Sequence, residues 1–234
     1  MTSITAATPI REQVAVVGFA IVPDVFPPEE MNRTLEALSG VVDSRSRAGA
    51  RHALRYEPVR ALADDKRLLS IAREILGADP IPFRATLFDK SPDANWLVIW
   101  HQDTALPLRS RADVPGWGPW SVKYGINYAH APATALEQVI ALRIHLDDST
   151  SANGPLRLLR KTHRFGVLRD EQVQQIAAQT EAVECAVPRG GVIAMRPLII
   201  HASSKSQSDI PRRVLHIEYG SSLSIAPELE LAIA

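Results

Sequence analysis

The feature that most constrains the fold is the spacing of turn residues from Pro80 onward. Short apolar runs alternate there with clusters of proline, glycine, asparagine or aspartate. This rhythm is typical of a chain built mainly from short β-strands. The strands that it predicts cover residues 83–88, 96–101, 124–128, 139–146, 156–159, 183–187, 192–195, 198–202 and 214–219, with one helix at 171–179.

The first 80 residues have a different pattern, in which apolar residues recur mostly at helical spacing. Proline and acidic residues mark the first turn of one predicted helix, and glycines mark the ends of both predicted helices. A run of β-branched residues before them predicts an opening strand. The elements predicted outside the β-rich part are a strand at 14–22, helices at 27–40 and 64–76, a loop at 43–55, and a short helix or loose tail at 226–234.

Together these patterns predict a mainly β fold. The expected form is a double-stranded β-helix, or jelly roll, of cupin-like architecture with an N-terminal helical layer packed on one sheet. A chain of 234 residues buries one sizeable core, so a single domain is expected over residues 1–234. Residues 1–80 are expected to supply the strand and the helical layer, and residues 81–222 the jelly-roll core.

Composition narrows the function classes. Lysine plus arginine and aspartate plus glutamate both number 26, so the formal net charge is zero, and neither nucleic acid nor a membrane surface is an expected partner. No apolar run reaches the roughly 18 residues of a membrane span. Cys185 is the single cysteine, which excludes an internal disulfide framework and fits a reducing compartment. We therefore expect a cytoplasmic monomer or homodimer whose partner is a small molecule.

A candidate metal site follows from three residues. His101 and Asp103 are two positions apart, and alternate residues of an extended segment point to the same side. His201 ends an apolar run about a hundred residues later and can supply a third ligand. Two histidines and one carboxylate form the facial triad typical of non-haem iron(II) oxygenases, which leaves positions open for a co-substrate and O2. The sequence therefore predicts iron(II) held by these three side chains.

A candidate carboxylate-binding residue lies soon after His201. Arg212 and Arg213 precede an apolar strand, and the planar guanidinium group pairs a carboxylate through two hydrogen bonds. The co-substrate 2-oxoglutarate chelates iron through its keto-acid end and leaves its other carboxylate in need of such a partner. Only one of the two arginines is expected to point inward, because neighbouring strand residues face opposite sides.

With these residues in place, the chain resembles the phytanoyl-CoA dioxygenase family of iron(II)- and 2-oxoglutarate-dependent oxygenases. The resemblance covers most of the chain, and its motifs occur in the family's order. They are Val17-Gly18-Phe19 to Glu29-Glu30, Trp100-His101-Gln102-Asp103, Leu146-Asp147-Asp148, Asn153-Gly154-Pro155-Leu156, His201-Ala202-Ser203 and Arg212.

The resemblance implies iron ligation by His101, Asp103 and His201 and a salt bridge from Arg212 to the distal carboxylate of 2-oxoglutarate. Arg212 is preferred over Arg213 because it lies eleven residues after His201, which is the spacing typical of the family. Ser203 resembles a position that hydrogen-bonds the same carboxylate. The implied activity is oxidation of a C–H bond in a small metabolite or natural-product intermediate, with formation of succinate and CO2. Because a carboxylate, Asp103, fills the position that halogenating relatives leave open for chloride, hydroxylation or a related oxidation is favoured.

One motif departs from the family. The usual Pro-Gly-Ser-His turn is replaced by Arg160-Lys161-Thr162-His163, which keeps the histidine and lacks the glycine. The sequence therefore does not predict the shape of the pocket at this turn. His163 is interpreted as structural.

The segment after the metal motif contains the candidate substrate-binding residues. Trp117 and Trp120 lie in a loop rich in glycine and proline, which is typical of functional connections, and are predicted to contact substrate. Polar contacts are predicted for Lys123, Tyr124 and Asn127. Trp96 and Trp100 are interpreted as core packing. Arg143 and His145 alternate on a predicted strand and can face the barrel interior, but the sequence identifies no partner for them.

A competing interpretation keeps the jelly roll as a cupin-like metal-binding protein or a non-oxidative metalloenzyme. Such a protein has no reason to place Arg212 and Ser203 as a carboxylate clamp beside the metal. The clamp therefore distinguishes the two hypotheses.

Overall fold

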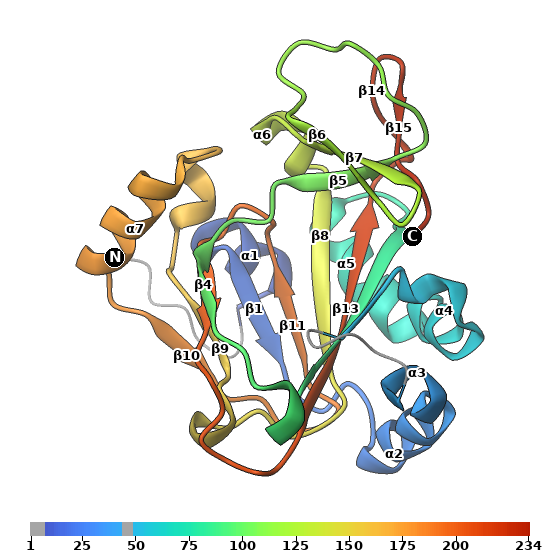
Figure 1. Cartoon of the computed structure of the whole chain (residues 1–234), viewed down its shortest axis with the longest axis vertical. Helices are drawn as coiled ribbons and strands as arrows, with labels where there is room; N and C mark the ends of the chain where they lie inside the picture. The colour runs from blue at the N-terminus through green and yellow to red at the C-terminus, as the bar shows by residue number, and fades with distance from the viewer. Residues whose placement is uncertain (1–7, 44–48) are drawn as a thin grey trace.

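Two antiparallel sheets form the centre of the protein in the computed structural model, which describes residues 8–43 and 49–234 (Figure 1). The larger sheet has the order β1-β11-β8-β13-β3-β2, and the smaller has the order β10-β9-β12-β4. The strands of the larger sheet are β1 (Phe19–Val22), β2 (Ala50–Arg51), β3 (Ile81–Lys90), β8 (Val139–His145), β11 (Val192–Met195) and β13 (Arg212–Gly220). Those of the smaller are β4 (Val98–His101), β9 (Leu156–Leu158), β10 (Val183–Cys185) and β12 (His201–Ser203). The predicted jelly roll is confirmed.

A layer of helices covers the outer face of the larger sheet, as predicted. Along β13, Leu215, Ile217 and Tyr219 enter a large apolar cluster that also holds helical side chains such as Met31 and Leu68. The alternate residues of β13 face the other way, toward the smaller sheet, because side chains alternate along a strand. The helices that contribute to this cluster are α1 (Ile10–Val17), α2 (Pro28–Ala37), α3 (Ser39–Asp43), α4 (Glu57–Ala63) and α5 (Lys66–Leu76).

The ends of α5 show why this part of the sequence forms a helix. The Asp65 side chain accepts a hydrogen bond from the Arg67 backbone N–H at 2.8 Å, which satisfies a donor in the first turn. Gly77 ends the helix in the left-handed conformation, with φ of 70°. Apolar residues between them recur at helical spacing, so one face packs on the sheet.

A third, three-stranded sheet stands beyond one end of the barrel. Its strands are β5 (Ala105–Leu108), β6 (Trp120–Lys123) and β7 (Ile126–His130), in the order β5-β7-β6. It shares an apolar cluster with the C-terminal hairpin of β14 (Ser224–Ala226) and β15 (Leu229–Glu230), which lies beside it in Figure 1. The remaining helical segments are α6 (Ala133–Leu136), α7 (Asp170–Gln179), η1 (Ala53–Arg55), η2 (Pro92–Ala94), η3 (Ser151–Asn153) and η4 (Thr162–Phe165).

Several predicted boundaries were wrong. The opening strand begins only at Phe19, because residues 10–17 form α1 and Gly18, with φ of 95°, turns the chain between the two. Val14 is fully buried in the apolar cluster between the helices and the larger sheet, so tertiary packing outweighs the β-preference of its branched side chain. Strands β5 and β6 and helix α4 were not predicted, and the strand expected at 124–128 is β7, which begins only at Ile126 after a turn. The predicted loop 43–55, of which residues 44–48 lie outside the described ranges, contains strand β2 and helix η1. Strand β12 starts later than expected, at His201, and a hairpin replaces the expected helix or tail at 226–234.

Among the residues described, no helix is long and apolar enough to cross a membrane.

Candidate active site

Three potential metal ligands converge at the edge of the smaller sheet. His101 ends β4 and His201 begins β12, and the two residues are paired directly across the two strands. Asp103 follows two residues after His101, where its backbone N–H donates to the Pro197 carbonyl at 3.0 Å. One ligand atom from each of the three side chains lies within 4.8 Å of the others. The structure thus brings together all three residues that the sequence singled out.

Backbone contacts orient both imidazole rings. His101 Nδ1 donates to the Ile99 carbonyl at 2.8 Å, and His201 Nδ1 donates to the Ile199 carbonyl at 2.9 Å. Because a carbonyl only accepts, each Nδ1 carries the proton and each Nε2 keeps its lone pair. The two Nε2 atoms face Asp103, whose carboxylate oxygens lie 3.8 Å from His101 and 3.5 Å from His201. This arrangement is typical of metal-binding histidines.

The local electrostatics favour the protonation states that ligate a cation. Burial, together with the neighbouring His101, lowers the pKa of His201 to about 4, so its ring is neutral at pH 7. Burial raises the pKa of the Asp103 carboxyl, but the two histidines outweigh that effect, and the pKa lies below its usual range. A neutral His201 imidazole and an ionised Asp103 carboxylate fit an iron(II) ion.

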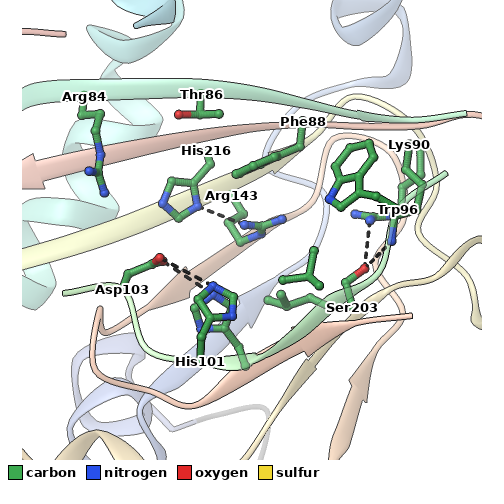
Figure 2. Close-up of a pocket in the computed structure, with 14 residues that line it drawn as sticks. Arg84, Thr86, Phe88, Lys90, Trp96, His101, Asp103, Arg143, Ser203 and His216 are labelled. Atoms are coloured by element: carbon green, nitrogen blue, oxygen red, sulfur yellow. Dashed lines mark hydrogen bonds and ion pairs between the residues drawn. The ribbon is translucent and has the colours of Figure 1, made fainter. Parts of the chain in front are cut away.

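A cavity of about 140 Å³ opens beside these ligands, between the two sheets (Figure 2). The larger sheet contributes alternate residues of β3 and β13, and the smaller sheet contributes apolar and hydroxyl side chains. The residues that line it with the three ligands are Arg84, Thr86, Phe88, Lys90, Trp96, Val98, Arg143, Leu156, Ser203, Arg212 and His216.

Lys90 and Ser203 meet at the end of this cavity that lies away from Asp103 (Figure 2), and Arg212 joins them there through its contact with Ser203. Lys90 Nζ donates to Ser203 Oγ at 2.8 Å and also to the Ser204 carbonyl. The Arg212 guanidinium donates to Ser203 Oγ at 3.4 Å and to the Asn153 carbonyl at 3.2 Å. Lys90 lies directly opposite Arg212 in the ladder between β3 and β13. We name these three residues the inner clamp.

Arg213 faces the other way. Its guanidinium pairs with both carboxylate oxygens of Asp147, at 2.7 and 2.9 Å, and it does not line the cavity. Of the two arginines between which strand alternation could not decide, Arg212 therefore is the one that enters the cavity. Lys90 was missed by the sequence reasoning, although it continues the alternation of the predicted strand 83–88.

The cavity holds more positive charge than the protein itself neutralises. Lys90, Arg143 and Arg212 are nearly fully buried, and within the described chain no ion pair joins any of them to a carboxylate. Burial and the charges of Arg212 and Arg143 lower the pKa of Lys90 to about 7, and burial with Arg143 lowers that of Arg212 to about 9. Buried cations are costly without a partner, so this end of the cavity suits an anionic ligand.

Arg143 and His145 both face the barrel interior. The Arg143 guanidinium donates to His216 Nδ1 at 3.1 Å and lies 5.2 Å from the centre of the Phe88 ring, which gives it the partners that the sequence did not reveal. His145 is buried, neither ring nitrogen has a hydrogen-bond partner, and burial holds its pKa well below the usual value. His163 contacts helix α1 through the Ala15 carbonyl at 3.3 Å and lies close against Gly18.

A second cavity, of about 270 Å³, lies on the other side of Asp103. It shares Arg84, Thr86, Phe88 and Asp103 with the first cavity, so the two meet at the ligand cluster. We name it the outer cavity. Its remaining lining residues are Arg51, His52, Gln102, Thr104, Ala105, Lys123, Tyr128 and His130.

The predicted substrate residues lie in different places. Lys123 lines the outer cavity, whereas Trp117 and Trp120 pack against the apolar cluster under the three-stranded sheet. Tyr124 is 77% exposed, and Asn127 lies on β7 next to Ile126. The lining of the two cavities at Asp103 includes none of these four residues.

Trp96 and Trp100, which were interpreted as core packing, differ from each other. Trp96 lines the first cavity, with Lys90 Nζ 5.5 Å from the centre of its ring. Trp100 packs on the cluster around Leu159 and Ile200 and lies under the Arg157 guanidinium.

The fold and the site together define a class, the jelly-roll metalloenzymes that place a histidine–carboxylate–histidine cluster beside an anion-binding pocket. The family model for phytanoyl-CoA dioxygenase (PhyH) matches residues 15–214, and the chain belongs to this family. It is thus an iron(II)- and 2-oxoglutarate-dependent oxygenase, as the sequence motifs predicted. By sequence, no curated protein matches the chain.

Solved structures share the fold at low sequence identity. AviO1 from Streptomyces viridochromogenes Tue57 is 21% identical with a TM-score of 0.66, over 90% of this chain and 93% of that one. EctD from S. alaskensis is 18% identical with a TM-score of 0.68, over 94% and 80%. SnoK, a non-haem α-ketoglutarate-dependent carbocyclase of nogalamycin biosynthesis, is 16% identical with a TM-score of 0.68, over 90% and 82%.

Proposed function

We propose that His101, Asp103 and His201 hold iron(II), that the inner clamp binds the distal carboxylate of 2-oxoglutarate, and that the enzyme hydroxylates a C–H bond of a small metabolite or natural-product intermediate. The observation that carries this proposal is the set of buried cations without carboxylate partners in the same cavity as the three ligands. A dicarboxylate that reaches from the ligands to Lys90 and Arg212 supplies the missing negative charge.

Each part of the site has a task in this reaction. When bound, iron(II) would activate O2, and the reaction would convert 2-oxoglutarate and O2 to succinate and CO2 while a substrate C–H bond becomes C–OH. Asp103 and the two histidine rings hold the ion, and their backbone hydrogen bonds keep the rings in one orientation. The inner clamp fixes the orientation of 2-oxoglutarate. The apolar side chains of Phe88, Val98 and Leu156 exclude water from around it.

The outer cavity is where we propose that the substrate lies, because it meets the ligand cluster on the side away from the inner clamp. Lys123 is the predicted substrate residue that lines it. Contacts from Trp117, Trp120, Tyr124 and Asn127 stay predictions, as do the cytoplasmic location and the monomeric or homodimeric state.

Anaerobic titration of 2-oxoglutarate into the iron(II)-loaded protein tests the proposal. We expect a visible charge-transfer absorption band in the wild type and none in His101→Ala, which lacks a ligand. His130→Ala is the matched control, because His130 lies nearby and hydrogen-bonds Thr104 at 2.7 Å. A wild-type protein that shows neither the band nor a thermal shift would remove the basis of the proposal.

A further inference from the structure

The outer cavity contains an excess of positive charge that the proposed reaction does not explain. Three cations line it, Arg51, Arg84 and Lys123, and Asp103 is the one carboxylate among its lining residues. Arg84 is already neutralised, because its guanidinium pairs with buried Glu218, at 2.7 Å for one of the two contacts, and donates to the Ala105 carbonyl. Asp103 belongs to the ligand cluster. Among the residues that the structure describes, Arg51 and Lys123 have no counter-charge.

Both remaining cations are aimed at the cavity. Arg51 lies on β2 directly opposite Thr86 of β3, and paired residues of an antiparallel ladder point to the same face. Thr86 lines both cavities. Lys123 ends β6, is half-buried, and places its Nζ 4.9 Å from the centre of the Tyr128 ring. Neither forms an ion pair with any carboxylate that the structure describes.

The positive field at this site is also visible in neighbouring groups. Burial and then the charges of Arg51 and Arg84 lower the pKa of Lys123. Burial and the nearby cations, Arg55 first among them, lower the pKa of His52. Because the whole chain has a formal net charge of zero, this local excess is a property of the cavity and not of the protein surface in general.

A polar wall of fixed geometry stands beside the two cations. The Tyr128 hydroxyl and His52 Nε2 are hydrogen-bonded at 2.8 Å, and their rings are nearly parallel. His52 has φ of 54°, a left-handed conformation that is costly for a residue other than glycine and is common at ligand sites. Tyr124, in the turn between β6 and β7, packs edge-on against the His52 ring. The turn that carries Lys123 is thereby held against the cavity.

We propose that the outer cavity binds a carboxylate or phosphate group of the substrate through Arg51 and Lys123, so that the substrate class is a small organic acid or phosphate ester. This inference rests on the function proposed above, since it places the anionic group on one side of the substrate and the reacting C–H bond on the side that faces Asp103. A cavity of about 270 Å³ suits a compact metabolite.

The test uses the iron(II)-loaded protein saturated with 2-oxoglutarate under anaerobic conditions, so that the inner clamp is occupied. Butyrate, inorganic phosphate and the neutral analogue butyramide are titrated separately and followed by calorimetry. We expect at least one anion to bind about tenfold more tightly than butyramide at low salt. Tighter binding of butyrate identifies a carboxylate site, and tighter binding of phosphate a phosphate site.

Two variants and a matched control locate the binding. Lys123→Gln is expected to weaken anion binding about tenfold. Arg51→Gln is expected to weaken it only about threefold, because Arg51 is exposed and its charge is screened by solvent. The control is Arg55→Gln, which removes a nearby charge that does not line the cavity and is expected to change binding less than twofold. Turnover provides a second readout, because acids should stimulate succinate release more than their amides or methyl esters do.

The two proposals fail in different ways. If 2-oxoglutarate does not bind the iron(II) protein, the proposed function is wrong. If 2-oxoglutarate binds but the anions and butyramide bind equally, or if Arg55→Gln weakens anion binding as much as Arg51→Gln and Lys123→Gln do, the anion site is overturned.

Discussion

The two faces of the larger sheet are built from the same strands and have opposite contents. On β13, Leu215, Ile217 and Tyr219 enter the apolar cluster beneath the helices. Between them, His216 and Glu218 are buried on the cavity side with Arg212. The same alternation on β3 places Leu87 outside and Lys90 inside. One face lowers the free energy of the folded state through apolar burial, whereas the other buries charge and raises it.

Stability and ligand binding therefore depend on opposite faces of the same strands. Residues one position apart on a strand are expected to affect different measurements, the outer ones the free energy of unfolding and the inner ones the affinity for ligands.

The largest effect is expected from the pair of neighbouring arginines. Arg212→Met should weaken 2-oxoglutarate binding about a thousandfold, close to 4 kcal/mol, because it removes a buried guanidinium from a charge-assisted contact. The affinity is measured by anaerobic titration of the iron(II) protein.

Arg213→Met is the matched control. It breaks the ion pair with Asp147, so it should lower the free energy of unfolding by about 2 kcal/mol and change the affinity less than threefold. If Arg213→Met were instead the variant that loses 2-oxoglutarate binding, the assignment of faces would be wrong.

A smaller effect, on stability alone, is expected from the outer face. Leu215→Ala should lower the free energy of unfolding by about 3 kcal/mol, because Leu215 is fully buried and its loss leaves a cavity. Urea unfolding measures the change. The affinity of the remaining folded protein for 2-oxoglutarate should stay within twofold of the wild type, and a parallel loss of affinity would show that the two faces are not independent.

The smallest effect is a pH dependence that originates in Lys90. Because the pKa of this buried ammonium is lowered to about 7, Lys90 loses its proton in the ligand-free protein as the pH rises above 7. A carboxylate favours the protonated form, so binding of 2-oxoglutarate takes up a proton and the affinity should fall about fivefold between pH 7 and pH 9. Titrations across that range measure it.

Stability should follow the opposite trend. The unfolded chain keeps Lys90 protonated up to about pH 10, so between pH 7 and that value it binds more protons than the ligand-free folded protein, and the free energy of unfolding rises with pH. Lys90→Met should remove most of both pH trends between pH 7 and pH 8, below the pKa of about 9 of Arg212. An unchanged pH profile of affinity in Lys90→Met would assign the effect to another group.

The sequence contained enough to predict the triad but not the whole site. His101 and Asp103 are close in sequence, and their spacing on an extended segment implies a shared direction without knowledge of the fold. Alternation along the predicted strand could have given the direction of Lys90, but its position beside Arg212, like that of Arg51 opposite Thr86, depends on the register of the sheet. A local sequence pattern does not determine which distant strands pair with each other.

The same reason explains the boundaries that were wrong. Val14 belongs to a β-branched run, yet its burial against the other helices makes the run helical as far as Val17. The hairpin of β14 and β15 has little periodicity of its own and owes its form to the apolar cluster that it shares with the three-stranded sheet. In both cases packing by distant residues decided the local structure.

The position of β4 at the free edge of the smaller sheet links metal binding to the local stability of this strand. Because His101 on this edge strand faces His201 on β12, an ion held by both links the edge to the interior of the sheet. Edge strands open more readily than central ones, so loading with metal should slow amide hydrogen exchange in β4 far more than in β9. The bound metal then stabilises the edge of the barrel, and the rate of amide hydrogen exchange in β4 reports whether the metal site is occupied.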